Sequence, residues 1–362
     1  MKPRGANRII FTFKTAVLKR IFLKAEFLKT SRFPIFVEQS KNPMKKTLLA
    51  IAALTLLTQS SLVAQKTGSP FQFLRFNESA RAAALGGAFV AMPEDPSAVF
   101  FNPASVWTSG DKAISATFLK HVLDINSGLL SYSDHAENFG SYAASVSYTN
   151  YGSFQRADRN GPTAGTFGVN DVSLAVSYAN ELDTNFFKGQ LSYGLTGKFL
   201  FVGLEVLNST ALALDGGLLL QLPHIRTNIG LAVLHLGTQL STFNGEKEPL
   251  PLDVRIGVNH RLRGLPLLLN FSFHHLADET DDVFQRFENF SLGGEFYFGK
   301  SIQARIGYDN GVRRSTTESS SRKLAGLSAG VGIITNFANI DYAISSFGSP
   351  ATLHRVSVGF GL

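Results

Sequence analysis

Large apolar side chains alternate with small or polar ones from about residue 112 to the end of the chain. In the stretch 171–179, one face carries Val172, Leu174, Val176 and Tyr178, and the opposite face carries only Asp, Ser and Ala. A period of two is typical of a β-strand with one apolar face. The same alternation recurs at 253–261, 265–274, 302–309 and 355–362.

The pattern predicts fourteen strands. We expect them at 112–120, 125–133, 139–150, 168–180, 189–204, 210–222, 226–236, 252–262, 266–276, 288–299, 301–310, 325–335, 338–346 and 353–362. A soluble sandwich with one wet face alternates in the same way. The polar face is rich in Gly and Ser, however, which suits a crowded lumen, and the alternation reaches the last residue, as in a closing strand. We therefore predict an all-β fold, a 14-stranded antiparallel transmembrane β-barrel over residues 111–362.

The links between the predicted strands indicate the orientation of the barrel. The longer links follow odd-numbered strands, and they lie at 151–167, 237–251, 277–287 and 311–324. Within them we expect loops at 156–166, 244–251, 277–287 and 313–323. Outer-membrane barrels have short periplasmic turns and long outer loops. With a periplasmic N-terminus, all four long links face outward.

The N-terminal part of the chain reads as a leader. Residues 44–64 have Lys45 and Lys46 before an apolar run and a small-residue site at Val63-Ala64, which is typical of a Sec-type signal peptide. Residues 1–43 are basic and Phe-rich, and we interpret them as an upstream start with Met44 as the true initiator; a transit peptide is the alternative. After the leader no uncharged apolar run approaches the roughly 18 residues of a membrane helix.

Charge and composition narrow the class of protein. The chain carries 34 Lys and Arg and 27 Asp and Glu, but residues 1–64 hold 12 of the basic and 2 of the acidic residues. The remainder therefore has a net charge of −3, which argues against a nucleic-acid partner. Only 17% of residues are charged, and 33 Gly and 31 Phe are present. With no Cys, disulfides, thiolate metal sites and Cys nucleophiles are excluded.

Residues 65–110 do not alternate and are expected to form a hatch segment in or under the barrel. Their core, ESARAAALGGAFVAMPEDPSAVFFNPASV, combines an Ala-rich run, a Gly pair and two turns at Pro. This motif resembles the opening of the PorV/PorQ family of Bacteroidetes-type outer-membrane proteins, whose barrel is similar to that of the FadL channels. The later stretch EPLPLDVRIGVNHRLRGLPLLLNFSFHHL is most similar to the PorQ branch.

The resemblance implies a FadL-like barrel in the type IX secretion system. It further implies an anchor for a surface attachment complex, with a PorZ-like surface protein, a PorU-like sortase and a PorV-like barrel as partners. Outer-membrane lipid and lipopolysaccharide would surround the protein. No cofactor is implied.

Three groups of candidate residues follow. The hatch motif contributes Arg81, Gly86, Gly87, Asp95, Asn102 and Pro103, which we interpret as architectural. Charged residues on the lumen face, expected to form a charge network that closes the pore or contacts a ligand, are Lys198, Asp215, Asp253, Arg255, Glu295, Arg305 and Asp341. Candidates for docking a partner on the outer loops are Asp278, Glu279, Asp281, Asp282, Arg313 and Arg314.

The sequence offers little sign of metal or enzyme chemistry. His274 and His275 are neighbours on a predicted strand, so they are expected to point to opposite faces and not to share a metal. The acidic loop at 278–282 lacks the spacing of a dedicated Ca²⁺ loop, and a solvated loop is the preferred interpretation. No His-Glu-x-x-His motif is present.

The sequence therefore predicts a non-enzymatic outer-membrane barrel that anchors the type IX attachment complex. The alternative is a FadL-like channel for hydrophobic compounds, with an apolar pocket beside the hatch and a lateral opening at a kinked strand.

Overall fold

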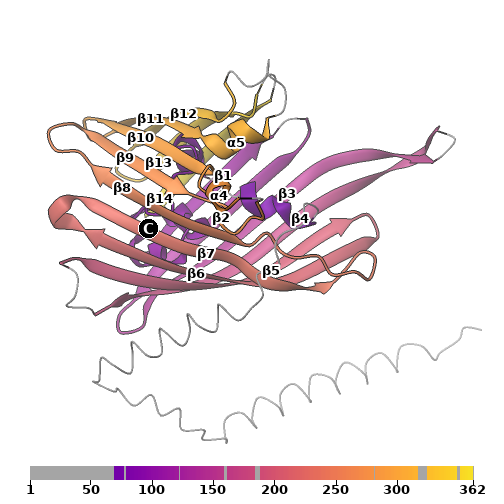
Figure 1. Ribbon diagram of the computed structural model, residues 1–362, viewed down its shortest axis with the longest axis horizontal. Helices are drawn as coiled ribbons and strands as arrows, with labels where there is room; N and C mark the ends of the chain where they lie inside the picture. The colour runs from indigo at the N-terminus through magenta and orange to yellow at the C-terminus, as the bar shows by residue number, and fades with distance from the viewer. Residues whose placement is uncertain are drawn as a thin grey trace, which may run out of the picture. The chain divides into compact units, whose positions relative to one another are not determined.

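The computed structural model describes residues 69–361, with gaps at 77–78, 122, 159–160, 184–187, 281, 317–323 and 349–350. The predicted leader and upstream extension lie outside the described residues. Within this part of the chain, fourteen antiparallel strands form a closed barrel in which each strand pairs with its neighbours in sequence and β14 pairs with β1 (Figure 1). The predicted fold class is confirmed.

The strands are β1 Ala113–Lys120, β2 Asn126–Ala136, β3 Gly140–Asp158, β4 Gly161–Leu182, β5 Gln190–Leu204, β6 Leu207–Leu222, β7 Thr227–Ser241, β8 Asp253–Arg261, β9 Leu267–Phe273, β10 Phe290–Phe298, β11 Ile302–Asp309, β12 Leu327–Ile334, β13 Asn339–Ser346 and β14 Thr352–Gly361. The short helices are η1 Gln72–Phe76, α3 Ala80–Ala84, η2 Pro96–Phe100, η3 Pro103–Thr108, η4 Pro223–Ile225, α4 Val283–Arg286 and α5 Asn310–Ser315. Among the residues that the structure describes, no helix is long and apolar enough to cross a membrane.

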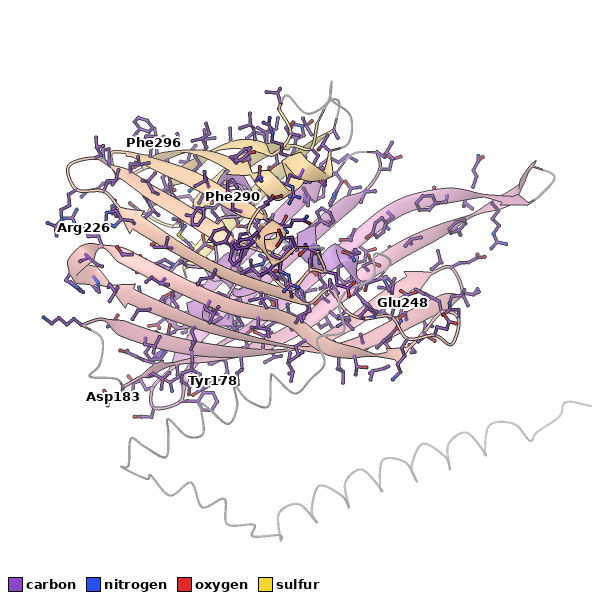
Figure 2. The ribbon with its side chains drawn as sticks, viewed as in Figure 1. Tyr178, Asp183, Arg226, Glu248, Phe290 and Phe296 are labelled. Atoms are coloured by element: carbon purple, nitrogen blue, oxygen red, sulfur yellow. The ribbon has the colours of Figure 1, made fainter. Side chains whose placement is uncertain are left out.

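The alternation of the sequence is explained by the two faces of the wall. Val176 and Leu214 point outward and are 69% and 64% exposed, whereas Ser173 and Ser177 of β4 point inward and are buried. Phe296 of β10 also points away from the barrel (Figure 2). An apolar exterior on a closed ladder, in which every strand finds a partner, is the arrangement that lipid requires. The barrel is therefore of the outer-membrane type.

The two ends of the barrel differ. Long links follow β7, β9 and β11, and they all lie at one end, here called the outer end because the rule for such barrels places long links outside the cell. Figure 2 shows Glu248 of the β7–β8 link at this end and Arg226 and Asp183 at the opposite, inner end. One expected loop is wrong, because most of 156–166 is strand: β3 and β4 run to Asp158 and from Gly161.

The hatch segment lies inside the barrel. Helix α3 packs on β11 to β14, η2 on β1 and β2, and η3 on β3 to β6, so the segment crosses the lumen. Its apolar residues, among them Leu85, Phe89 and Phe101, are almost fully buried. At the outer end, Phe71 and Phe73 near the start of the segment cover an apolar stretch of the inner wall on β5 and β6.

Glycines in the wall mark where the hatch touches it. A Cβ atom added to any of seven inward positions would lie less than 3.0 Å from a hatch atom. We call these positions the wall glycines, and they are Gly194, Gly217, Gly230, Gly257, Gly293, Gly307 and Gly330. At four of these positions, Gly194, Gly230, Gly293 and Gly307, the nearest hatch atom is a backbone atom, so the two backbones approach at a distance that only glycine permits. At the other three the nearest hatch atom belongs to a side chain.

Candidate functional site

The hatch motif forms one short helix, after which the chain reverses direction sharply. Ser79 caps α3 by accepting a hydrogen bond from the Ala82 backbone N–H, and the small alanines let the helix lie against the wall. Gly86 and Gly87 follow with φ of 66° and 79°. At Gly86 a Cβ would lie 2.7 Å from the backbone N of Tyr308, so both the space and the backbone conformation require glycine.

Arg81 is the centre of an ion cluster between hatch and wall. Its guanidinium lies 3.0 Å from Glu295 of β10 and 3.1 Å from Asp95 of the hatch. Arg305 of β11 lies 3.4 Å from Glu295 and 2.5 Å from Asp341 of β13. We call these five residues the inner ion cluster. It ties the hatch to three strands, and the Glu295 carboxylate, which contacts both arginines, is fully buried.

Asn102 and Pro103 serve the packing of the hatch. The Asn102 side chain donates to the carbonyls of Val90 (2.9 Å) and Leu218 (3.0 Å) and accepts from the Ala104 N–H (3.0 Å). Pro103 begins η3, a position that suits its fixed φ. Since Asn102 is fully buried and uses its polar atoms within the chain, the geometry favours an architectural role over ligand contact.

The seven lumen residues named from the sequence do not form a single network. Glu295, Arg305 and Asp341 join the inner ion cluster. Nearer the outer end, Lys198 lies 2.6 Å from Asp215. Arg255 and Asp253 of β8 form a further pair at 2.7 Å. The alternation predicted that these charges lie on the lumen side, but it did not indicate which of them form ion pairs with one another.

A bulge in β7 lies beside Lys198 and Asp215. His235 has φ of 64°, and the pairing of β6 with β7 shifts register across Asp215. The Asp215 carboxylate accepts a hydrogen bond from the displaced His235 N–H (2.8 Å). Strand pairing continues on both sides of the bulge, so the strand is kinked here while the ladder stays closed.

A cavity of about 350 Å³ lies between the hatch and the outer links; we call it the outer cavity. One side is apolar and includes Phe76 and Phe347. The other side is polar and includes His274 and Ser291, whose fully buried hydroxyl has no hydrogen-bond partner among the described residues. The pocket beside the hatch is thus half polar, in contrast to the apolar pocket expected for a channel.

Arg75 of the hatch helix η1 holds the link that roofs this cavity. Its guanidinium makes two hydrogen bonds, of 2.6 and 3.0 Å, to the carboxylate of Asp278. Bidentate pairs of this kind fix orientation as well as distance. The β9–β10 link and the hatch are therefore coupled directly.

The two neighbouring histidines both face the lumen, which corrects the expectation that they point to opposite faces. Strand β9 ends at Phe273, and His275 has φ of 55°, so the chain turns after the strand and the two rings meet at 4.7 Å. His274 lies 3.4 Å from Asp309, and His275 lies 3.1 Å from Asp253. Burial lowers the pKa of His275 below its ordinary value, and the nearby Asp253 carboxylate only partly opposes this.

No metal site results from this arrangement. In the described part of the chain, no three His, Asp or Glu side chains gather closely enough to hold an ion.

A second cavity, of about 540 Å³, lies at the inner end. Its lining includes Arg81, Arg305 and Asp341, and also Arg261, whose guanidinium lies 4.5 Å from the ring centre of Tyr297. The buried hatch residues separate this cavity from the outer one. The lumen therefore contains two cavities with the hatch between them.

The residues predicted to dock a partner have mixed surroundings. Asp278 is held by Arg75, and Asp282 caps α4 by accepting from the Phe284 N–H at 3.0 Å. Glu279 and Arg313 are exposed, and Arg314 is paired with Glu288 at 2.6 Å. Asp281 lies outside the described residues.

Sequence reasoning missed Arg75, His235 and Ser291. Arg75 precedes the recognisable hatch motif, and nothing in its local sequence indicates a partner 203 residues away. His235 depends on a bulge, and Ser291 is one of many inward-facing serines.

Comparison with known proteins places the fold. No protein-family model matches the chain, and no curated protein matches it in sequence. A mutant of the monoaromatic hydrocarbon channel TodX (deltaS2S3) superposes with a TM-score of 0.50 at 14% identity, over 79% of this chain and 99% of that one. The Pseudomonas putida toluene transporter TodX gives 0.49 at 11% identity, over 78% and 96% of the two chains. A Pseudomonas aeruginosa FadL homologue gives 0.45 at 12%, over 78% and 98%. At 14% identity, the likeness to the TodX mutant shows the barrel fold alone.

Proposed function

We propose that this protein is a FadL-type channel of the outer membrane that admits a small compound with an apolar body and a polar group. The outer cavity carries this proposal. Its volume of about 350 Å³ falls within the ~300–1,000 Å³ of small-molecule sites. The solved barrel that resembles this chain at a TM-score of 0.50 is described as a monoaromatic hydrocarbon channel.

The lining of the cavity argues for a ligand of mixed character. Phe76 and Phe347 offer apolar surface, while the unpartnered Ser291 hydroxyl and the His274 ring offer hydrogen bonds. A buried polar group without a partner is costly, so a ligand that supplies one is favoured over a bare hydrocarbon.

Passage requires that the hatch move. Phe71 and Phe73 cover an apolar wall that includes Leu200 and Ala211, so displacement of η1 would expose a hydrophobic path below the outer cavity. Arg75 links η1 to the roof of that cavity through Asp278. A ligand that moves the roof would therefore act on the hatch.

The test is uptake by cells whose only such channel is this protein. Val312 of α5 lines the outer cavity, and Val312→Trp places an indole in it without replacing a residue of the barrel wall. We expect the initial uptake of labelled toluene or benzyl alcohol to fall by about tenfold, equivalent to about 1.4 kcal/mol of lost binding. Uptake of benzyl alcohol is expected to exceed that of toluene, because only the alcohol can bond to Ser291.

Arg314→Trp is the matched control, since Arg314 lies on the same helix, is exposed and is absent from the cavity lining. It should leave uptake unchanged. Equal uptake by cells with and without the barrel would reject the channel.

The second candidate is the type IX anchor of the PorV/PorQ resemblance, exported by the signal peptide at 44–64. The observation in its favour is the exposed charge on the outer links, with Glu279 and Arg313 free at the surface. Its partners would be the PorZ-like, PorU-like and PorV-like proteins.

The anchor makes a separate prediction. Deletion of the gene should leave cargo with C-terminal sorting domains unprocessed or released from the cell surface. Replacement of 277–287 or 311–324 by short Gly/Ser turns should release the surface partner while the barrel still folds. Unchanged cargo together with reduced solute uptake would favour the channel.

A further inference from the structure

Three short turns at the inner end of the barrel carry positive charge and no negative charge. They join β6 to β7, β8 to β9 and β10 to β11, and with their flanks they cover residues 222–228, 259–267 and 297–303, which contain no Asp or Glu. Figure 2 shows one of their cations, Arg226, at the inner end. We call the four exposed cations of these turns the inner basic rim, and they are Arg226, Arg261, Arg263 and Lys300.

The three turns lie side by side, so the rim is continuous. The Arg261 backbone N–H donates to the carbonyl of Arg226 at 3.0 Å, and the Arg263 guanidinium donates to the carbonyl of His224 at 3.4 Å. These two bonds join the β8–β9 turn to the β6–β7 turn. On the other side, the Arg261 guanidinium covers the ring of Tyr297 in β10, the strand that leads into the third turn.

The rim is not neutralised from within the chain. Within the part of the chain that the structure describes, none of its four cations forms an ion pair. Glu94 of the hatch lines the inner cavity together with Arg226 and Arg261, but it pairs with neither. The acidic residues of the inner end belong instead to the turns after β2 and β4, where Glu137 and Asp183 lie. The positive charge is therefore confined to one side.

Each turn of the rim also exposes an apolar side chain. Ile225, Leu265 and Phe298 are 44%, 60% and 60% exposed. Phe298 is opposite Ile302 in register, and both lie on the lipid-facing side of the wall. A cation beside an exposed apolar residue suits the membrane interface, where the apolar group meets acyl chains and the cation meets a phosphate. A soluble anion would leave these apolar side chains in water.

The depth of the turns in the membrane selects the anion. The turn between β10 and β11 is short, since β10 ends at Phe298 and β11 begins at Ile302, so Lys300 lies directly beyond the apolar belt. Turns of this kind lie among the polar headgroups of the periplasmic leaflet. The anions of that layer are phospholipid phosphates, which attract clustered Lys and Arg. We propose that the inner basic rim binds the headgroup of an anionic phospholipid, whose acyl chains lie against Leu265, Phe298 and Ile302.

The experiment measures which lipids stay on the protein. The purified barrel is placed in nanodiscs with equal amounts of phosphatidylglycerol and phosphatidylcholine, and native mass spectrometry counts the lipids that it retains. Phosphatidylglycerol is expected to exceed phosphatidylcholine by about tenfold. Arg263→Gln with Lys300→Gln should bring this ratio to within about twofold of one. Neither residue lines the inner cavity, so solute uptake should not change and the channel is tested separately.

The matched control is Lys112→Gln with Lys188→Gln, which removes two exposed cations of the inner end outside the rim. It should keep the wild-type ratio. Equal retention of the two lipids by the wild-type protein, or an equal loss in the control, would overturn the proposal.

Two further measurements do not depend on neutralising the charge. Photoactivatable phosphatidylglycerol should label peptides from 259–267 and 297–303, and labelling of the turn after β2 instead would place the lipid elsewhere. Leu265→Ser with Phe298→Ser should lower retention of phosphatidylglycerol severalfold, because the acyl chains lose their contact. Complete displacement of the lipid by soluble glycerol 3-phosphate would show a site for the phosphate alone and would refute the lipid.

Discussion

Replacement of Arg81 by Met should loosen the hatch more than replacement of Glu295 by Gln. The inner ion cluster holds three carboxylates, from Asp95, Glu295 and Asp341, and two guanidinium groups, from Arg81 and Arg305. Removing Glu295 leaves two charges of each sign, each still in contact with a partner. Removing Arg81 leaves three carboxylates around one cation.

The magnitude follows from the burial of these groups. Loss of one partner from a buried ion pair costs about 3–5 kcal/mol, and Arg305 still compensates Glu295, so about 3 kcal/mol is expected for Arg81→Met. Because Arg81 belongs to the hatch and Glu295 to the wall, this energy is lost from the docked state of the hatch. A change of about 3 kcal/mol raises the undocked population roughly a hundredfold.

Single-channel recording in planar bilayers measures that population as the open fraction. Arg81→Met should raise it about a hundredfold and Glu295→Gln by less than about tenfold. The double variant should lie between them, because it returns the cluster to its native net charge of −1 but leaves Asp95 without its contact to Arg81. Arg81→Lys is the control, since it keeps the charge. An open fraction for Glu295→Gln equal to or above that of Arg81→Met would refute the charge-balance argument, provided that both proteins show the heat-modifiable mobility of a folded barrel.

Three further outcomes are expected. Gly86→Ala should lower the thermal transition of the barrel, because the new methyl group would meet the backbone of Tyr308 and φ is positive there; a calorimetric scan with Gly299→Ala as the exposed control tests this. His121, in the β1–β2 link, has its pKa lowered to about 4 by burial and by the charge of Arg355. Its stabilising contribution is therefore complete above about pH 6.5 and is lost as the pH falls towards 4, so His121→Gln should flatten the acid side of a stability–pH curve. Asp278→Asn should speed tryptic cleavage in the β9–β10 link by severalfold, since Arg75 no longer holds it, and an unchanged rate would show that the pair does not restrain the link.

The fold was predictable because lipid and lumen impose opposite demands on alternate residues. Outward-facing residues such as Val176 and Leu214 must be apolar, and the inward-facing residues on either side of each must be small or polar. This alternation repeats in nearly every strand. The far end of the β3–β4 hairpin, residues 153–158 and 161–168, was not predictable in the same way. Its Gly-rich sequence has few β-branched residues and reads as a loop, yet the ladder that starts in the barrel carries its pairing outward.

The candidate site was predictable in kind and not in detail. The alternation predicted that Glu295 and Arg305 lie on the lumen side. It did not predict that Arg81, 214 residues before Glu295, contacts it, because that contact depends on the path of the hatch. The position of His275 rests on a positive φ at a residue other than glycine, which has no local signature in the sequence.

The wall glycines have a consequence for how the two parts of this protein can change. Each of the seven leaves room for a particular hatch atom, so the inner wall is complementary in shape to this one hatch. A hatch from a related barrel would approach the wall at other positions, where larger wall side chains would block its backbone. The outer links can be exchanged piece by piece, but the hatch and the inner wall form a single inherited unit, altered together or left alone.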